Sequence, residues 1–97
     1  MALVMSAKVR AKLAGKTPPV TEEEILQCFA NKQGKLLVDS RAHNQTNPPT
    51  RWFIAETNLG RKLKVAYIPL DGDIVIKTAY DPNPEEQRIY VKFGLNG

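Results

Sequence analysis

Basic side chains recur at alternate positions of a stretch whose apolar pattern is that of β-strands. Lys62 and Lys64 lie two residues apart in one apolar run, and Lys77 lies in a second run of apolar and small residues. Alternate residues of a strand point to the same face of a sheet. Because antiparallel neighbours place same-face residues side by side, we expect the three lysines to share one face, opposite a face built from apolar residues. Three like charges there favour an anionic ligand such as a phosphate backbone.

Metal-independent cleavage of RNA is chemistry that the residues of this region could perform. A base removes the proton of the 2′-hydroxyl, an acid protonates the leaving oxygen, and cations stabilise the charged phosphate. No spacing in the sequence selects one acid–base pair. The candidate catalytic residues are Lys64, Lys77, Arg61, Glu56, Tyr80 and His43, and the candidates for RNA binding are Arg51, Trp52, Lys62 and Lys12.

Each of these candidates also has a structural interpretation. Lys77 could simply face solvent, and Arg61, at a turn, could be an exposed charge as readily as a phosphate contact. Glu56 lies among cations, which favours a salt bridge over a general base. Tyr80 is typical of a core residue with a bonded hydroxyl group. His43 lies in a polar loop, where histidine is usually solvated, although its pKa suits proton transfer.

Two further candidates are open to the same choice. Trp52 is typical of a core or rim aromatic residue, and base stacking is the alternative. Lys12 belongs to a basic cluster near the N-terminus, which is either a solvated helix face or an extension of an RNA-binding surface.

Composition narrows the class of protein. The 97 residues predict one domain, residues 1–97, and the net charge of +4 favours nucleic acid, an acidic protein or an anionic surface as partner. Cys28 is the only cysteine, which excludes an internal disulfide and metal sites built on paired cysteines. We therefore predict no metal and no cofactor. No apolar run reaches membrane-spanning length, so we expect a cytoplasmic protein without a membrane partner.

The elements that must position these residues follow from local patterns. A basic amphipathic helix is expected over residues 5–16, and a second helix begins after Thr21, where Glu24 completes a capping box. A short strand at residues 36–38 and a polar loop at 39–50 come next. Strands are predicted over 51–57, 62–69 and 74–80, followed by a helix over 85–92. The expected fold is α+β, with two N-terminal helices packed on a four-stranded, mainly antiparallel sheet and a short C-terminal helix.

With these residues in view, the chain resembles the small RNase toxins of the RelE superfamily, and especially their BrnT-like branch. The resemblance covers roughly residues 20–93 in element order. Its closest motifs are Gly60-Arg61-x-Leu63-x-Val65-x-Tyr67, Ile74-x-Ile76-x-x-Ala79 and Glu86-x-x-x-Tyr90. It implies an endoribonuclease of a type II toxin–antitoxin system, with RNA as substrate and a small DNA-binding antitoxin as protein partner.

A non-catalytic function on the same fold is the alternative. BrnT-like chains carry a Lys-His-Gly element where this chain has Ala14-Gly15-Lys16, without the histidine, and Tyr80 stands where that family often has arginine. These differences favour a module that binds RNA or an acidic protein. A subunit that binds only protein, through the same basic face, is a third possibility.

Overall fold

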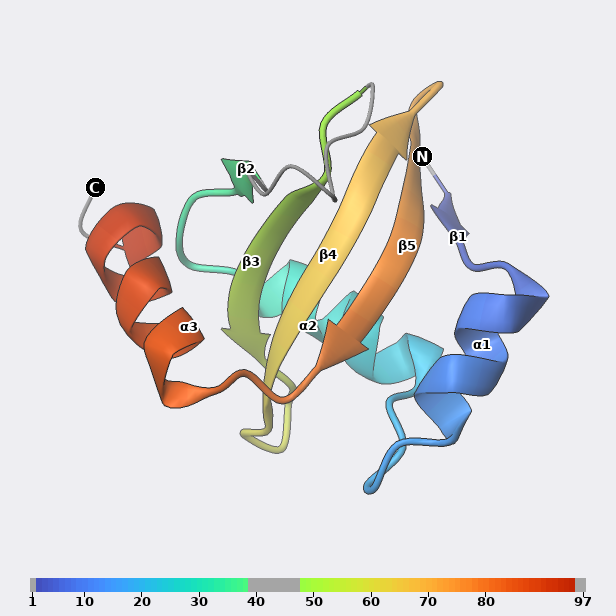
Figure 1. Cartoon of the computed structure of the whole chain (residues 1–97), viewed down its shortest axis with the longest axis horizontal. Coiled ribbons are helices and arrows are strands. Elements are labelled where there is room, and N and C mark those ends of the chain that lie inside the picture. The colour runs from blue at the N-terminus through green and yellow to red at the C-terminus, as the bar shows by residue number, and fades with distance from the viewer. Residues whose placement is uncertain (1, 39–47, 96–97) are drawn as a thin grey trace.

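Five strands form one sheet, in the order β1-β5-β4-β3-β2 (Figure 1). The computed structural model describes residues 2–38 and 48–95. The three long strands, β3 (Arg51–Glu56), β4 (Lys62–Leu70) and β5 (Asp73–Tyr80), pair antiparallel in the middle of the sheet. At one edge β1 (Leu3–Val4) runs parallel to β5, and at the other β2 (Leu37–Val38) runs antiparallel to β3.

The α+β class is confirmed, but the predicted number of strands is wrong. Among the described residues the sheet has five strands rather than four, and it is mixed because β1 pairs parallel with β5. The missed strand is only two residues long and directly precedes a helix, so it has no alternating pattern of its own. It forms because β5 offers its free edge to Leu3 and Val4, which pair with Ile74 and Val75.

The two N-terminal helices are α1 (Ala7–Ala14) and α2 (Glu22–Asn31). The predicted capping box of α2 is present, since the Thr21 hydroxyl accepts the Glu24 N–H at 3.1 Å and Glu24 accepts the Thr21 N–H at 3.1 Å. Helix α2 lies behind the sheet in Figure 1. Its Phe29 packs edge-on against Phe53 and Tyr67, with ring centroids 4.8 and 5.4 Å apart.

The hydrophobic core lies between the N-terminal helices and one face of the sheet, which we call the α2 face. It consists of fully buried apolar side chains from both helices and from β3, β4 and β5: Leu13, Ile25, Cys28, Phe53, Leu63, Val65, Ile76 and Ala79. The predicted alternation of β3 and β4 therefore holds, because Phe53, Leu63 and Val65 point to the helices and Lys62 and Lys64 point away.

The third helix, α3 (Pro84–Tyr90), continues into a π-helical turn at Val91–Leu95. It stands beside β3 at the edge of the sheet (Figure 1) and packs on the face opposite α2, which we call the α3 face. The centroid of its Tyr90 ring lies 5.7 Å from that of Trp52, a residue of the α3 face. No helix in the described part of the chain has the length and apolar character needed to cross a membrane.

A β-bulge in β5 changes the predicted arrangement of the lysines. Ala66 pairs with Thr78, but the next residue of β4, Tyr67, pairs with Ile76, so Lys77 has no partner in the ladder. The bulge inserts one residue and interrupts the alternation of side chains. The predicted common face of Lys62, Lys64 and Lys77 rested on that alternation. Tyr80, rather than Lys77, lies opposite Lys64.

Candidate functional site

Three ionisable side chains meet on the α3 face. Lys64 Nζ donates a hydrogen bond to Glu86 Oε2 at 2.8 Å, and the Tyr80 hydroxyl donates to the same oxygen at 2.5 Å. The β4–β5 register places Lys64 opposite Tyr80, and α3 brings Glu86 to both. The Lys64 side chain is only 7% exposed and that of Glu86 16%. The cluster is therefore an ion pair and a phenol largely withdrawn from water.

The start of α3 positions Glu86. The Asn83 side chain accepts the Glu86 N–H at 2.7 Å, and Glu86 Oε1 accepts the Asn83 N–H at 3.0 Å, which forms a second capping box. Both carboxylate oxygens of Glu86 therefore accept hydrogen bonds. Burial raises the pKa of Glu86, but the bonds from Lys64, Tyr80 and the Asn83 backbone outweigh burial and hold this pKa below its usual value. Glu86 is thus ionised at neutral pH and is a weak proton acceptor.

Tyr80 presents a half-buried ring near two ammonium groups. Lys16 Nζ and Lys64 Nζ each lie 5.6 Å from the ring centroid. Burial and the hydrogen bond to Glu86 raise the pKa of Tyr80, and the opposing influence of Lys64 does not cancel them. Tyr80 is therefore a neutral phenol at physiological pH, and its hydroxyl is a hydrogen-bond donor.

The Trp52 ring packs against Lys64 of this cluster. Lys64 Nζ lies 4.5 Å from the Trp52 ring centroid, within the range of a cation–π interaction, and Tyr90 packs beside the same ring. Trp52 is 9% exposed. Its contacts with Lys64 and Tyr90 leave little of the ring for the base stacking considered from the sequence.

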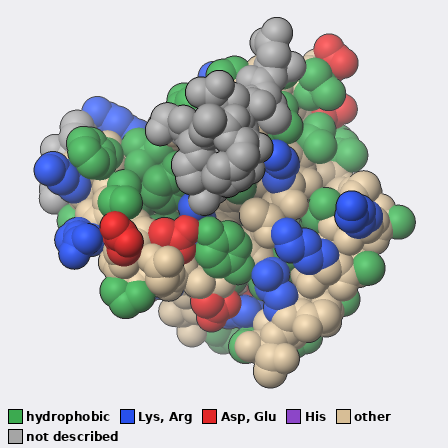
Figure 2. Space-filling view, in the orientation of Figure 1, with side chains coloured by type: hydrophobic (Ala, Val, Ile, Leu, Met, Phe, Trp, Pro, Cys, Tyr) green, Lys and Arg blue, Asp and Glu red, His purple; other side chains and the backbone are tan. Residues whose placement is uncertain are grey.

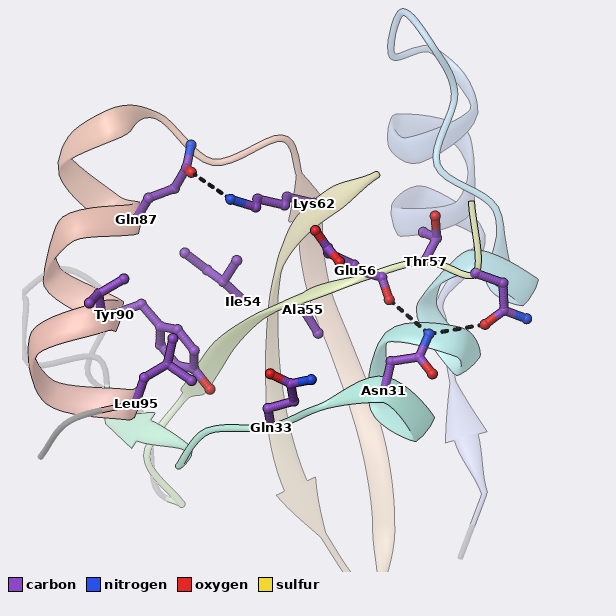
Figure 3. A pocket seen from close by; sticks show the side chains of 12 residues that line it. Asn31, Gln33, Ile54, Ala55, Glu56, Thr57, Lys62, Gln87, Tyr90 and Leu95 are labelled. Carbon is purple, nitrogen blue, oxygen red and sulfur yellow. Dashed lines mark hydrogen bonds between the residues drawn. The ribbon is translucent and has the colours of Figure 1, made fainter. Parts of the chain in front are cut away.

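Lys62 and Glu56 face each other across the β3–β4 pair beside a hollow of about 690 Å³. Figure 3 shows this hollow between β3, the end of α2 and α3. Lys62 Nζ lies 3.5 Å from the Gln87 side-chain oxygen. Within residues 2–38 and 48–95, Glu56 forms no ion pair, so the salt bridge that the sequence favoured for it is not found there.

Arg61 is a structural cross-link rather than a free cation. Its guanidinium donates to Asp81 at 2.7 Å, to Glu24 at 3.3 Å and to the backbone carbonyls of Pro18 and Pro19 at 2.9 and 2.7 Å. The hydrogen bond with Asp81 is the main cause that raises the pKa of Arg61. Together with the Nε bond to Asp81, these contacts engage the N–H groups of the fork. The geometry therefore leaves Arg61 little capacity for a phosphate.

The remaining candidates do not join the cluster. Arg51 is exposed and lies two residues before Phe53, so it shares the α2 side of β3. There it lowers the pKa of Tyr67, against the larger effect of burial. Lys12 is exposed in the last turn of α1, and Lys77 sits in the bulge of β5. His43 falls outside the described residues.

Sequence reasoning missed two members of the site, Glu86 and Lys16. Glu86 belongs to the Glu86-x-x-x-Tyr90 motif and lies three residues after Asn83, so the sequence could have identified it as a capping residue. Nothing local indicates that its carboxylate would reach Lys64, 22 positions earlier. For the same reason, the partners of Arg61 could not be recognised from spacing.

Neither a metal site nor a relative adds to this description. Among the described residues, no group of three His, Cys, Asp or Glu side chains is arranged to hold a metal ion. No protein family, curated protein or solved structure matches the chain.

Proposed function

We propose that the protein binds single-stranded RNA on the α3 face, with Tyr80 and the neighbouring Lys16 at the centre of the contact. The observation that carries this proposal is the half-buried Tyr80 ring, with Lys16 Nζ 5.6 Å from its centroid. Proteins bind unpaired RNA by stacking bases on aromatic rings while nearby cations hold the backbone phosphates. Tyr80 supplies such a ring, and Lys16 supplies an accessible cation beside it.

The distribution of charge supports the same face. Figure 2 shows several basic side chains on the part of this face that lies over β5 and towards α1. The net charge of the chain is +4. A cationic field of this kind raises the rate and affinity of association with a polyanion.

A toxin-like role follows from the resemblance rather than from the cluster alone. Two helices before the long antiparallel strands and a short helix after them are the order that the RelE-like resemblance implies, and this order supports the proposal. In that role the protein would act on RNA in the cytoplasm, and a small DNA-binding antitoxin would neutralise it.

RNA cleavage is the second candidate function, and the contact between Tyr80, Glu86 and Lys64 favours it. Glu86 would accept the proton of the attacking 2′-hydroxyl, Tyr80 would protonate the leaving oxygen, and Lys16 would stabilise the charge on the phosphate. Both oxygens of Glu86 already accept hydrogen bonds, and its pKa is low for a general base. The α3 face therefore fits RNA binding more directly than proton abstraction.

Binding is tested with a short, labelled, mixed-sequence single-stranded RNA in a metal chelator at several salt concentrations. Lys16→Ala should weaken binding and reduce the slope of log affinity against log salt by about 0.7, the loss of one phosphate contact. Lys8→Ala removes the same charge from an exposed position of α1 and is the matched control. Equal losses in the two variants would contradict a local contact at Tyr80.

The aromatic contribution has its own matched pair. Tyr80→Phe keeps the ring and should retain RNA affinity, whereas Tyr80→Leu should lose about 1–3 kcal/mol of binding free energy with the stacked base. The same reactions, run on a gel, report cleavage. If the wild-type protein cleaves, Tyr80→Phe should stop cleavage without loss of binding; if the wild type gives no products, the second candidate function is rejected and binding stands.

A further inference from the structure

One arginine joins the two segments that carry the proposed RNA contact. Arg61 lies directly before β4, and its guanidinium donates to Asp81, the residue after Tyr80, at 2.7 Å. The same guanidinium donates to the backbone carbonyl of Pro18, two residues after Lys16, at 2.9 Å. Figure 1 shows that the loop between α1 and α2, the turn before β4 and the end of β5 lie at the same end of the sheet.

The loop between α1 and α2 has few bonds of its own. Its far end is fixed, because Val20 is buried in the core and its N–H donates to the Leu13 carbonyl at 3.0 Å. Pro18 and Pro19 lack N–H groups, and within the described part of the chain only Arg61 donates to their carbonyls. Arg61 therefore holds the middle of the loop, whereas the ends of the loop are packed without it.

Arg61 is poorly placed to bind a phosphate itself. Its bonds to Glu24, Asp81 and the two proline carbonyls engage all three nitrogens of the guanidinium. Its side chain is only 18% exposed, and two carboxylates already balance its charge. An RNA phosphate would have to displace one of these carboxylates. Any contribution of Arg61 to RNA binding is therefore expected through the residues that it holds in place.

Lys16 is the residue of the loop whose position matters for RNA. Lys16 Nζ lies 5.6 Å from the centroid of the Tyr80 ring, within the range of a cation–π contact. A lysine side chain has a flexible four-carbon stem, so its ammonium group stays near a ring only when its backbone is fixed. Arg61 ties that backbone, at Pro18, to the end of the strand that carries the ring, at Asp81.

We propose that Arg61 is a positioning residue that holds Lys16 against Tyr80, and so sets the geometry of the RNA contact without touching RNA. The position of Lys16 is a property of the free protein, whereas the effect on RNA rests on the proposed RNA-binding function. Separate measurements therefore test the two parts.

NMR of the free protein tests the position of Lys16. The ring current of Tyr80 should shift the ε-methylene protons of Lys16 upfield of those of Lys8, and Tyr80→Leu should remove this shift. Arg61→Lys keeps the positive charge but cannot bridge a carboxylate and two backbone carbonyls at once, so it should remove the shift as well. An Arg61→Lys protein that keeps the Lys16 shift would overturn the proposal.

Arg10→Lys is the matched control. Arg10 of α1 pairs with Glu22 of α2 at 3.0 Å, so this arginine also joins the two helices, but it does not bond to the loop between them. The same replacement at this position should leave the Lys16 shift unchanged. An equal loss of the shift in Arg10→Lys and Arg61→Lys would mean a general loosening of α1, and would also overturn the proposal.

RNA binding tests the consequence. Arg61→Lys leaves the net charge at +4, yet it should reduce the slope of log affinity against log salt by about 0.7, as Lys16→Ala does. The double variant should lose no more affinity than Lys16→Ala alone, because Arg61 acts through Lys16. A further loss in the double variant would mean that Arg61 contacts RNA itself, and would overturn the proposal. If the wild type binds no RNA, the proposed function fails, and the Lys16 shift still decides whether Arg61 positions Lys16.

A measurement on the wild-type protein covers the case in which Arg61→Lys does not fold. The Nε–H of Arg61 donates to Asp81, so it should exchange with solvent about tenfold more slowly than that of Arg88, whose side chain is 77% exposed. Added RNA should shift the side-chain resonances of Lys16 more than the Nε–H of Arg61. Fast exchange at Arg61, or a larger RNA-dependent shift there than at Lys16, would overturn the proposal.

Discussion

Replacing Glu86 with glutamine should destabilise the protein by about 2–3 kcal/mol, because the change leaves the ammonium group of Lys64 without its counter-charge. The glutamine carbonyl can still accept the N–H of Asn83, so the cap of α3 survives and the loss reports mainly on the charge. Lys64 is 7% exposed and cannot reach water without displacing its neighbours. A cation confined in this way is costly when it is unpaired.

The expected magnitude follows from the geometry of the pair. Unit charges 2.8 Å apart attract by about 6 kcal/mol at an effective dielectric constant near 20, and withdrawal of both groups from water offsets part of this. Removing one partner of a fully buried pair costs about 3–5 kcal/mol. The Lys64 and Glu86 side chains keep some exposure, 7% and 16%, so the expected loss lies at the low end of that range or just below it, at about 2–3 kcal/mol.

A double-mutant cycle measured by urea unfolding at neutral pH checks this reasoning. Lys64→Met, Glu86→Gln and the double variant should give a coupling free energy of at least about 1.5 kcal/mol. Glu85 and Arg88 provide the control, since this pair is 3.9 Å apart with side chains 71% and 77% exposed and should couple by less than about 0.5 kcal/mol. If the two cycles give equal coupling, the Lys64–Glu86 pair is screened by solvent and the reasoning is refuted.

The pH dependence of the unfolding free energy tests the role of the Glu86 charge independently. The pKa of Glu86 is lower in the folded protein than in the unfolded chain, so its contribution to stability is complete above the ordinary carboxyl pKa, about 4.3, and is lost as the pH falls through the folded value. The difference in unfolding free energy between wild type and Glu86→Gln should therefore shrink on acidification from neutral pH. A difference that persists at low pH would show that the carboxylate charge is not its cause.

Two further predictions concern packing. A Cβ atom at Gly94 would lie 2.5 Å from the Tyr90 ring. Although alanine normally favours a helix, Gly94→Ala should therefore destabilise the protein by about 1–3 kcal/mol in urea unfolding. An unchanged stability would mean that the turn after α3 moves freely away from Tyr90. Burial raises the pKa of Cys28 to about 11 and leaves its side chain inaccessible. A thiol reagent at neutral pH should therefore label the native protein far more slowly than the protein unfolded in urea. Equal labelling rates would contradict a packed α2 face.

Much of the local structure could be predicted from short patterns. Thr21 and Glu24 mark the start of α2, and the alternation of β3 and β4 separates Phe53 and Leu63 on the α2 face from Lys64 on the other. These signals act over a few residues, through the first hydrogen bonds of a helix or the two-residue repeat of a strand. Helix starts and strand faces can therefore be predicted from sequence wherever a helix or strand has no irregularity.

Local patterns do not predict the bulge in β5 or the first strand, β1. Lys77 leaves the ladder because β5 contains one residue more than β4 requires at that point, and Leu3–Val4 become a strand only because β5 offers them an edge. Both depend on a partner strand that lies elsewhere in the sequence. The regular alternation assumed for β5 is consequently interrupted at Lys77.

The sequence by itself determined the residues that could bear charge and, for β3 and β4, the face of the sheet on which they lie. Only the tertiary structure decided which charges remain available to a ligand. The Arg61 guanidinium is bonded to Glu24, Asp81 and two backbone carbonyls, and the Lys64 ammonium group is paired with Glu86. The physical reason is that these hydrogen bonds and ion pairs depend on where distant segments meet, over separations of 20 to 43 residues, and no local pattern encodes that meeting.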